Sequence, residues 1–498
     1  MTLRAATSAS PIPRRIWLLL LIVLLSCFRI AHVHLLWADE DYHLAAAIQL
    51  IHGKIPYRDF WYDKPPLSAF YYSLIAGYSG WLLRLLDAAF ILTACAICYR
   101  LAHLWWSQAE AFTAALLFAF FTTFYLPSTV IPFAADAVML VPHLLAIYFG
   151  ARRQALQAGF FGGIAFLANA KGLFVLLVCA LWLWPDWLLL GVGFAIPAGL
   201  GTAALYLLGA WPGYVQQVWR WGLIYAEGSP VTHPFTLGLV RTADWLGFHS
   251  ALAIGFAFAA MRLSRRERFQ IGSWLGLSFA AVCLGTRFAP HYFLQFLPGM
   301  VIAASRGLVL AWREYRFRAA LLIAVWLSIP FIRFAPRYFS LAYDDAANRR
   351  PNWIDVNLDL DSQDVARALA TTARPGDTLF VWGYRPDIYV YTRLIPPGLF
   401  WDSQPLTGVP ADRHLTATDA IYGGPAAANR LQVAQTQPTW IVDGLGLLNP
   451  RLRPDVYPEL KQWMLRYQVI ARTRLSLIYR ERAPAERIIL PIRTPAQR

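Results

Sequence analysis

The sequence predicts a polytopic α-helical membrane protein of about eleven transmembrane helices, followed by a small α/β domain. Three observations support this prediction. The 498 residues are 58% hydrophobic and 15% charged, whereas soluble domains carry roughly 25% charged residues. Apolar runs long enough to cross a bilayer recur through the first two thirds of the chain. From about residue 337 the composition becomes that of an ordinary soluble domain.

Each predicted span is an apolar run close to the length of about 20 residues that a helix needs to cross the hydrocarbon core. The runs lie at 15–36, 81–101, 109–126, 133–150, 154–184, 187–208, 245–261, 271–286, 291–311 and 319–335. The run 154–184 is too long for one helix, and a lysine such as Lys171 at mid-membrane would cost roughly 3 kcal/mol. We therefore expect two helices that meet near 169–172.

The positions of the arginines predict the orientation of the bundle. With two crossings in 154–184, the groups around Arg14, Arg100, Arg152, Arg265 and Arg316 all fall on one side. The positive-inside rule assigns that side to the cytoplasm. The same rule accounts for the net charge of +15 and argues against nucleic-acid binding. The length of the first run favours an uncleaved anchor over a signal peptide.

This orientation predicts a protein of the cytoplasmic (inner) membrane that has two parts. Residues 1–336 are expected to form the transmembrane module, with outer loops at 37–80 and 210–244. Residues 337–498 are expected to form an extracytoplasmic α/β domain. A helix is predicted at 362–373, and strands at 378–382, 439–443 and 475–479.

Three consecutive acids, Asp39, Glu40 and Asp41, directly follow the first apolar run. The helix predicted after them has an apolar stripe with helical spacing, which we expect to lie on the bilayer interface. A capping role at the start of this helix would account for one acid, but not for three. The acids are therefore candidates for chemistry.

The rest of the first outer loop carries a more specific pattern. It contains Gly53-Lys54-Ile55-Pro56-Tyr57 and then Asp63-Lys64-Pro65-Pro66-Leu67. An acidic pair after the first helix, then G-x-x-P-Y and an acid-K-P-P-L segment, resembles the GT-C superfamily, in particular the protein O-mannosyltransferase and lipid A aminoarabinose transferase families. The resemblance extends over roughly 37–300, where Asp136, Lys171-Gly172, Arg287 and His291-Tyr292 resemble further positions of these families.

The resemblance implies a GT-C transmembrane bundle that transfers a sugar from a polyprenyl-phosphate carrier to an acceptor hydroxyl at the outer face of the membrane. Such a transfer needs a carboxylate to accept the proton of the acceptor and cations to hold the departing phosphate. We expect Asp39 to act as the general base, with Glu40 as its partner and Asp136 as a second anchor. The expected phosphate ligands are Lys64, Lys171, Arg287 and His291, and the expected substrate contacts are Asp63, Tyr57, Arg58 and Tyr292.

No cofactor is expected to be required, and the sequence leaves a divalent cation open. Some relatives carry a histidine in the second outer loop that joins the first-loop acid in binding a metal, which makes Asp63 and His233 candidate ligands. One carboxylate and one histidine form an incomplete ligand set. A turn or a substrate contact is therefore the favoured interpretation of His233.

The expected partners are a polyprenyl-phosphate-sugar donor, an acceptor that is a lipid, a glycan or a protein, and the bilayer itself, without nucleic acid. Two other functions stay open. A secondary transporter would place ionisable groups near the bilayer midplane and commonly shows paired repeats. A non-catalytic membrane assembly protein would use the soluble domain to bind partners. The sugar, the acceptor and the polyprenol chain are not specified by the sequence.

Overall fold

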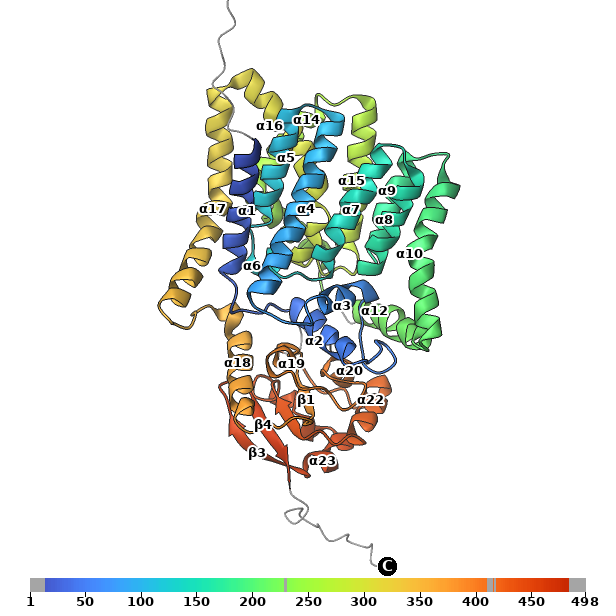
Figure 1. Ribbon diagram of the computed structural model, residues 1–498, viewed down its shortest axis with the longest axis vertical. Coiled ribbons are helices and arrows are strands. Elements are labelled where there is room, and N and C mark those ends of the chain that lie inside the picture. Colours follow the sequence, from blue (N-terminus) through green and yellow to red (C-terminus); the bar gives the residue numbers. More distant parts are fainter. Residues whose placement is uncertain (1–13, 228–230, 410–414, 416–417, 483–498) are drawn as a thin grey trace, which may run out of the picture.

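The computed structural model describes residues 14–227, 231–409, 415 and 418–482. The chain forms a bundle of helices with a small α/β domain at one end, and short helices of the first outer loop lie between the two (Figure 1). The turn between the last two bundle helices lies at the opposite end of the bundle. The bundle therefore has one end at which it meets the outer loop and the soluble domain.

The bundle contains one helix for each predicted apolar run, with the run 154–184 divided into two. Its helices are α1 (Arg14–Ile30), α4 (Trp81–Trp105), α5 (Gln108–Phe121), α7 (Ala135–Ala151), α8 (Ala155–Ala168), α9 (Gly172–Trp182), α10 (Trp187–Leu207), α14 (Ser250–Ala260), α15 (Arg265–Cys283), α16 (Leu297–Tyr315) and α17 (Phe317–Ala346). The predicted break near 169–172 is confirmed, because α8 ends at Ala168 and α9 begins at Gly172.

Within the described residues, α4, α10 and α17 are individually long and apolar enough to cross a bilayer. A fourth span is formed if α13 (Pro234–Phe248) and α14, which meet at 90°, are counted together. Helices α5, α7, α8 and α9 are apolar but shorter. Small residues let these helices approach closely, as is usual inside membranes. A Cβ atom on Gly193 of α10 would lie 2.1 Å from the Leu156 carbonyl oxygen of α8.

The segments between the spans form short helices at the end of the bundle near the soluble domain. The first outer loop forms α2 (Glu40–Ile51) and α3 (Pro66–Ser73), and α6 (Pro127–Val130) precedes α7. The second outer loop forms α11 (Trp211–Tyr214), the π-helix η1 (Val215–Arg220), α12 (Trp221–Glu227) and α13. The short 3₁₀ helix η2 (Pro290–Leu294) precedes α16.

The C-terminal domain is a four-stranded sheet with helices packed on it. The strands are β1 (Leu379–Trp382), β2 (Trp440–Asp443), β3 (Tyr467–Arg472) and β4 (Leu477–Glu481), in the order β1-β2-β4-β3. Strands β1 and β2 are parallel, and the other two pairs are antiparallel. Three of these strands lie at the predicted positions, whereas β3 was not predicted.

Helices and short 3₁₀ turns complete the C-terminal domain. They are η3 (Ile354–Val356), α18 (Asn357–Ala370), α19 (Asp387–Thr392), α20 (Gln404–Thr407), α22 (Gly424–Ala434), η4 (Pro450–Leu452), η5 (Pro454–Val456) and α23 (Pro458–Met464). Helix α18 corresponds to the predicted helix at 362–373 but begins five residues earlier. Helix α17 continues through the expected domain boundary at 336–337 and ends at Ala346.

Helix α2 does not lie on the bilayer surface, so that expectation was wrong. Its residues from Glu40 to Gln49 are all buried, because the helix is covered by the bundle on one side and by the C-terminal domain on the other (Figure 1). A backbone hydrogen bond links the first outer loop to the C-terminal domain beside it, from Trp61 N–H to the Leu399 carbonyl at 2.7 Å. Leu44, Ala47 and Ile48 of the apolar stripe that suggested a membrane surface instead pack inside the protein, whereas Ile51 at its end is exposed.

Candidate active site

Asp39 occupies the N-cap position of α2 with a backbone φ of 75°, a conformation that non-glycine residues rarely adopt. Its side chain makes no capping hydrogen bond, and it is only half-buried. Strained backbone of this kind costs about 1–3 kcal/mol and concentrates at functional sites. The Asp39 side chain therefore does not cap α2, although Asp39 occupies the N-cap position. Asp39 instead lines a cavity.

Glu40 has a different environment from its neighbour. Its two carboxylate oxygens accept hydrogen bonds from the Arg84 guanidinium of α4 at 2.6 and 2.9 Å, and from the backbone N–H groups of Trp37 and Phe133. Glu40 and Arg84 are fully buried. The carboxylate is thus occupied by structural partners, which favours a positioning role over the catalytic role expected from the sequence.

Asp136 lies in the first turn of α7, where the helix dipole favours a negative charge. Its carboxylate accepts a hydrogen bond from Asn169 at 2.9 Å and lies 3.4 Å from the Lys171 ammonium group. The His291 Nε2 atom is 3.7 Å from the other oxygen. The Lys171 ammonium also lies 3.2 Å from the centre of the Tyr292 ring. Three distant segments are thereby joined in one polar cluster.

Lys64 lies beside this cluster. Its ammonium group is 3.3 Å from the Asp63 carboxylate. Burial alone would lower the pKa of Lys64, but Asp63, with Tyr225 and Asp39, outweighs this effect and raises it. Lys64 is therefore a permanent cation within electrostatic range of Asp39. Burial is also the main reason that the pKa of Asp402 is raised to about 7, with Asp63 adding to the shift.

Arg287 contributes a second cation from the segment before η2. Its guanidinium donates a hydrogen bond of 2.5 Å to the Tyr225 hydroxyl and stacks over the same ring at 3.8 Å. Tyr225 also lies within electrostatic range of Lys64. The second outer loop, through Tyr225 of α12, thus links Lys64 to Arg287.

A cavity of about 300 Å³ lies over Asp39 and His291, and the C-terminal domain forms part of its wall. The residues contributed by that domain include Tyr384, Arg385 and Asp387, which directly follow strand β1. The sequence analysis assigned none of them to the site. Their position at the carboxyl end of a strand of an α/β domain was the available signal, because ligands commonly bind at such edges.

Aromatic stacking holds this wall against the first outer loop. The ring of Tyr42 in α2 stacks on Tyr384 at 5.8 Å and on Trp401 at 4.9 Å. On the loop side it stacks on Tyr62 at 5.4 Å, and its hydroxyl accepts a hydrogen bond from the Asp63 N–H. The stack places the C-terminal residues next to the Asp63-Lys64 segment.

Three buried carboxyl groups meet at the same interface. Burial, followed by the charge of Asp387, raises the pKa of Asp41 and raises that of Asp359 to about 8. Burial likewise raises the pKa of Asp387, although Arg385 beside it acts in the opposite direction. These groups therefore hold protons at pH values where exposed carboxyl groups are ionised.

The remaining predicted residues lie outside this cluster or play another part. The Tyr57 hydroxyl donates a hydrogen bond to the backbone carbonyl of Lys64 at 2.7 Å, so Tyr57 positions the lysine. Arg58 pairs with Asp59 and with the Leu208 carbonyl at the end of α10, and it is not among the described residues that line the cavity. His233 is exposed at the start of α13. Among the described residues, no group of three or more His, Cys, Asp or Glu side chains is arranged to hold a metal ion.

Comparison of the fold with solved structures gives similarities that cover most of this chain. ArnT from Cupriavidus metallidurans bound to undecaprenyl phosphate matches with a TM-score of 0.61 and 16% identity, over 94% of this chain and 97% of that one. The apo state of ArnT from Cupriavidus metallidurans matches with the same TM-score and 15% identity, over 94% and 98% of the two chains. The oligosaccharyltransferase AglB from Archaeoglobus fulgidus matches with a TM-score of 0.47 and 12% identity, over 92% and 73%.

No protein-family model matches the chain, and no curated protein matches it in sequence. The likeness to ArnT includes both the helical bundle and the C-terminal domain, because it covers almost the whole of each chain. The predicted fold, a GT-C helical bundle with a small α/β domain, is confirmed by this likeness.

Proposed function

We propose that the chain is an integral membrane glycosyltransferase that moves a sugar from a polyprenyl-phosphate donor to an acceptor hydroxyl. The observation that carries this proposal is the arrangement around Asp39. A carboxylate without a capping partner faces a cavity, and Lys64 lies within electrostatic range of it. Carboxylate and cations at one membrane-proximal site are the groups that glycosyl transfer from a phosphate carrier needs.

In the proposed reaction, Asp39 accepts the proton of the acceptor hydroxyl as the acceptor oxygen forms a bond to the anomeric carbon. The bond between that carbon and the phosphate oxygen breaks, and the carrier leaves as a lipid phosphate with one additional negative charge. Lys64 and Arg287 are proposed to stabilise this charge, with Lys171 and His291 completing the phosphate site. Asp136 orients Lys171 and His291, since both contact its carboxylate.

The position of the charged groups favours this reaction over transport. The cluster around Asp39 and Lys64 lies where the bundle meets the soluble domain, and residues of that domain line its cavity. A transporter would instead hold its substrate site near the bilayer midplane, between repeats. We further propose that the bundle lies in the cytoplasmic membrane with the site and residues 337–498 extracytoplasmic, as the arginine distribution indicates.

The donor can be identified by incubating the purified protein with a panel of polyprenyl-phosphate sugars and measuring the donor-dependent loss of sugar. The proposed acceptor is a lipid, a glycan or a protein, and each class forms one arm of the assay. We propose that no cofactor is required, and a parallel reaction with a chelator tests whether a divalent cation contributes. Absence of turnover or hydrolysis with every donor would contradict the proposal.

The role of Asp39 is tested by Asp39→Asn. The amide keeps the shape of the side chain but cannot accept the proton, so we expect normal donor binding and a turnover reduced by about 10²–10⁴. Asp59→Asn is the matched control, because Asp59 lies in the same loop and pairs with Arg58 away from the cavity. If Asp39→Asn kept more than about a third of the turnover, Asp39 would not be the base, and Asp136 would be tested next.

A further inference from the structure

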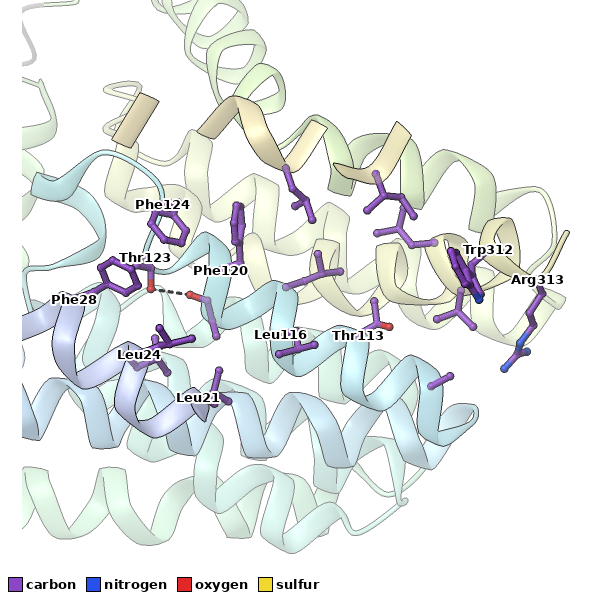
Figure 2. A pocket seen from close by; sticks show the side chains of 18 of the residues that line it. Leu21, Leu24, Phe28, Thr113, Leu116, Phe120, Thr123, Phe124, Trp312 and Arg313 are labelled. Carbon is purple, nitrogen blue, oxygen red and sulfur yellow. Dashed lines mark hydrogen bonds between the residues drawn. The ribbon is translucent and has the colours of Figure 1, made fainter. Parts of the chain in front are cut away.

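A large apolar cavity lies between α1, α5, α16 and α17, away from the candidate active site. Its volume is about 770 Å³. Figure 2 shows that Leu21 and Leu24 of α1 and Leu116 and Phe120 of α5 point into it. The polar side chains Trp312 and Arg313 lie at one end, and Phe28 and Phe124 lie at the other.

The cavity is long enough for a lipid chain. Its lining along α5 extends from Ala109 to Phe120, which is about 17 Å at 1.5 Å per residue. The hydrocarbon region of one leaflet is about 15 Å thick, half of the bilayer core. A lipid acyl chain that enters beside Arg313 can therefore stay inside the protein across the full thickness of one leaflet. An elongated apolar cleft of these dimensions suits an acyl chain better than a compact ligand.

The polar end of the cavity carries surplus positive charge. Glu110 is fully buried and is shared by two guanidinium groups, Arg306 at 2.7 Å and Arg313 at 3.5 Å. Glu267 also lies within electrostatic range of Arg306, so two carboxylates face Arg306 and Arg313, and the surplus comes from a third arginine. The Arg313 side chain is 49% exposed. Arg316, which also lines the cavity, is exposed at the end of α16. The opening thus combines an apolar cleft with cations at the level where a phospholipid headgroup would lie.

We propose that this cavity binds an anionic phospholipid, with one acyl chain between α1 and α5 and its phosphate at Arg313 and Arg316. The leaflet is the one on the side of the α16–α17 turn, opposite the C-terminal domain (Figure 1). A zwitterionic lipid would gain less, because its headgroup carries a cation that the arginines repel. The site is independent of the proposed transferase function, whose phosphate cations lie at the other end of the bundle.

The proposal is tested by native mass spectrometry of the purified full-length chain in detergent. The probes are phosphatidylglycerol and phosphatidylcholine with identical acyl chains. We expect one phosphatidylglycerol molecule to be retained in preference to phosphatidylcholine. Each of the substitutions Arg313→Gln and Arg316→Gln should weaken this preference by about fivefold, since each arginine near a membrane surface contributes about that much attraction for anionic lipid. Equal retention of the two lipids by the unmodified protein would overturn the proposal.

The apolar part of the site is tested separately by Thr113→Trp, which places a ring in the cavity where Figure 2 shows the threonine hydroxyl. Retention of phosphatidylglycerol should be lost. Leu200→Trp is the control, because Leu200 of α10 is exposed outside the cavity. Arg313→Gln removes contacts to Ser107 and Glu110 and could therefore lower the yield of folded protein. In that case Arg316→Gln still tests the role of the positive charge. Undiminished binding in Thr113→Trp would place the lipid elsewhere and refute the site.

Discussion

The buried pair of Glu40 and Arg84 allows a structural role of Glu40 to be separated from a catalytic one. Arg84 binds both carboxylate oxygens and also donates hydrogen bonds to the carbonyls of His32 and Leu35. The pair therefore connects α4 to the segment that carries Asp39. Through Phe133 N–H, Glu40 also connects to the chain just before Asp136. We expect Glu40→Gln and Arg84→Met to destabilise the protein through the same interaction.

The expected loss follows from burial. Removing one member of a buried ion pair leaves an uncompensated charge and costs roughly 3–5 kcal/mol. With an unfolding entropy of about 2 cal/mol/K per residue and 498 residues, 1 kcal/mol corresponds to about 1 °C. Each single variant should therefore unfold about 3–5 °C lower. The double variant contains no unpaired charge, so its loss should be smaller than the sum of the single losses by about 2 kcal/mol.

Thermal unfolding of the four proteins in detergent measures these losses, and turnover is measured well below the lowest midpoint. We expect Glu40→Gln to keep turnover within about tenfold of the unmodified protein, whereas Asp39→Asn loses about 10²–10⁴. The reasoning would be refuted if Glu40→Gln unfolded at the unmodified midpoint and yet lost as much turnover as Asp39→Asn. Glu40 would then act on the substrate rather than on the fold.

Three further predictions concern the site and its orientation. Lys64→Ala and Arg287→Ala should each weaken donor binding by about 10–100-fold, the equivalent of one charged hydrogen bond. The control variant Arg58→Ala should bind the donor normally. Unchanged donor affinity in both Lys64→Ala and Arg287→Ala would show that neither residue belongs to the phosphate site. The raised pKa of Asp359, about 8, means that the folded state keeps a proton that the unfolded state releases near pH 4. The resulting stabilisation is complete below about pH 4 and is lost as the pH rises through 8. Hydrogen exchange in α2 and α19, corrected for its intrinsic pH dependence, should therefore accelerate between these pH values. The substitution Asp359→Asn should make this exchange less dependent on pH. A cysteine at the exposed Thr371 should react with an impermeant maleimide from outside the cell, and reaction only after the inner face is opened would reverse the proposed orientation.

The helical bundle could be predicted because its information is local. An apolar run of sufficient length identifies each helix without knowledge of its neighbours. The polar interruption at Lys171 identified the break between α8 and α9 for the same reason. The position of α2 was not predictable in this way, because an apolar stripe requires burial but does not specify whether lipid or protein provides it. The C-terminal domain, which covers α2, is separated from it by some 300 residues.

The candidate site shows the same difference. Asp39 and Lys64 could be selected because both belong to one loop with a recognisable spacing. The sequence could not show that Glu40 forms a buried ion pair whereas Asp39 lines the cavity. The partner of Glu40 is Arg84, and nothing in the sequence distinguishes this arginine near the start of a membrane helix. Tyr225, which bonds to Arg287, likewise gave no signal, since one aromatic residue in a loop rich in them is not distinctive.

The C-terminal wall of the cavity has a consequence for the proposed reaction. The acceptor hydroxyl must reach Asp39, and the cavity over Asp39 is lined jointly by the first outer loop, by His291 and by the segment after β1. The donor cations Lys64 and Arg287 come from the outer loops, whereas Tyr384, Arg385 and Asp387 come from the soluble domain. In the proposed reaction, the soluble domain therefore contributes to the cavity that receives the acceptor, and His291 lies where the donor site and this cavity meet. Substitutions in 384–387 should accordingly alter the use of acceptors more than the affinity for the donor.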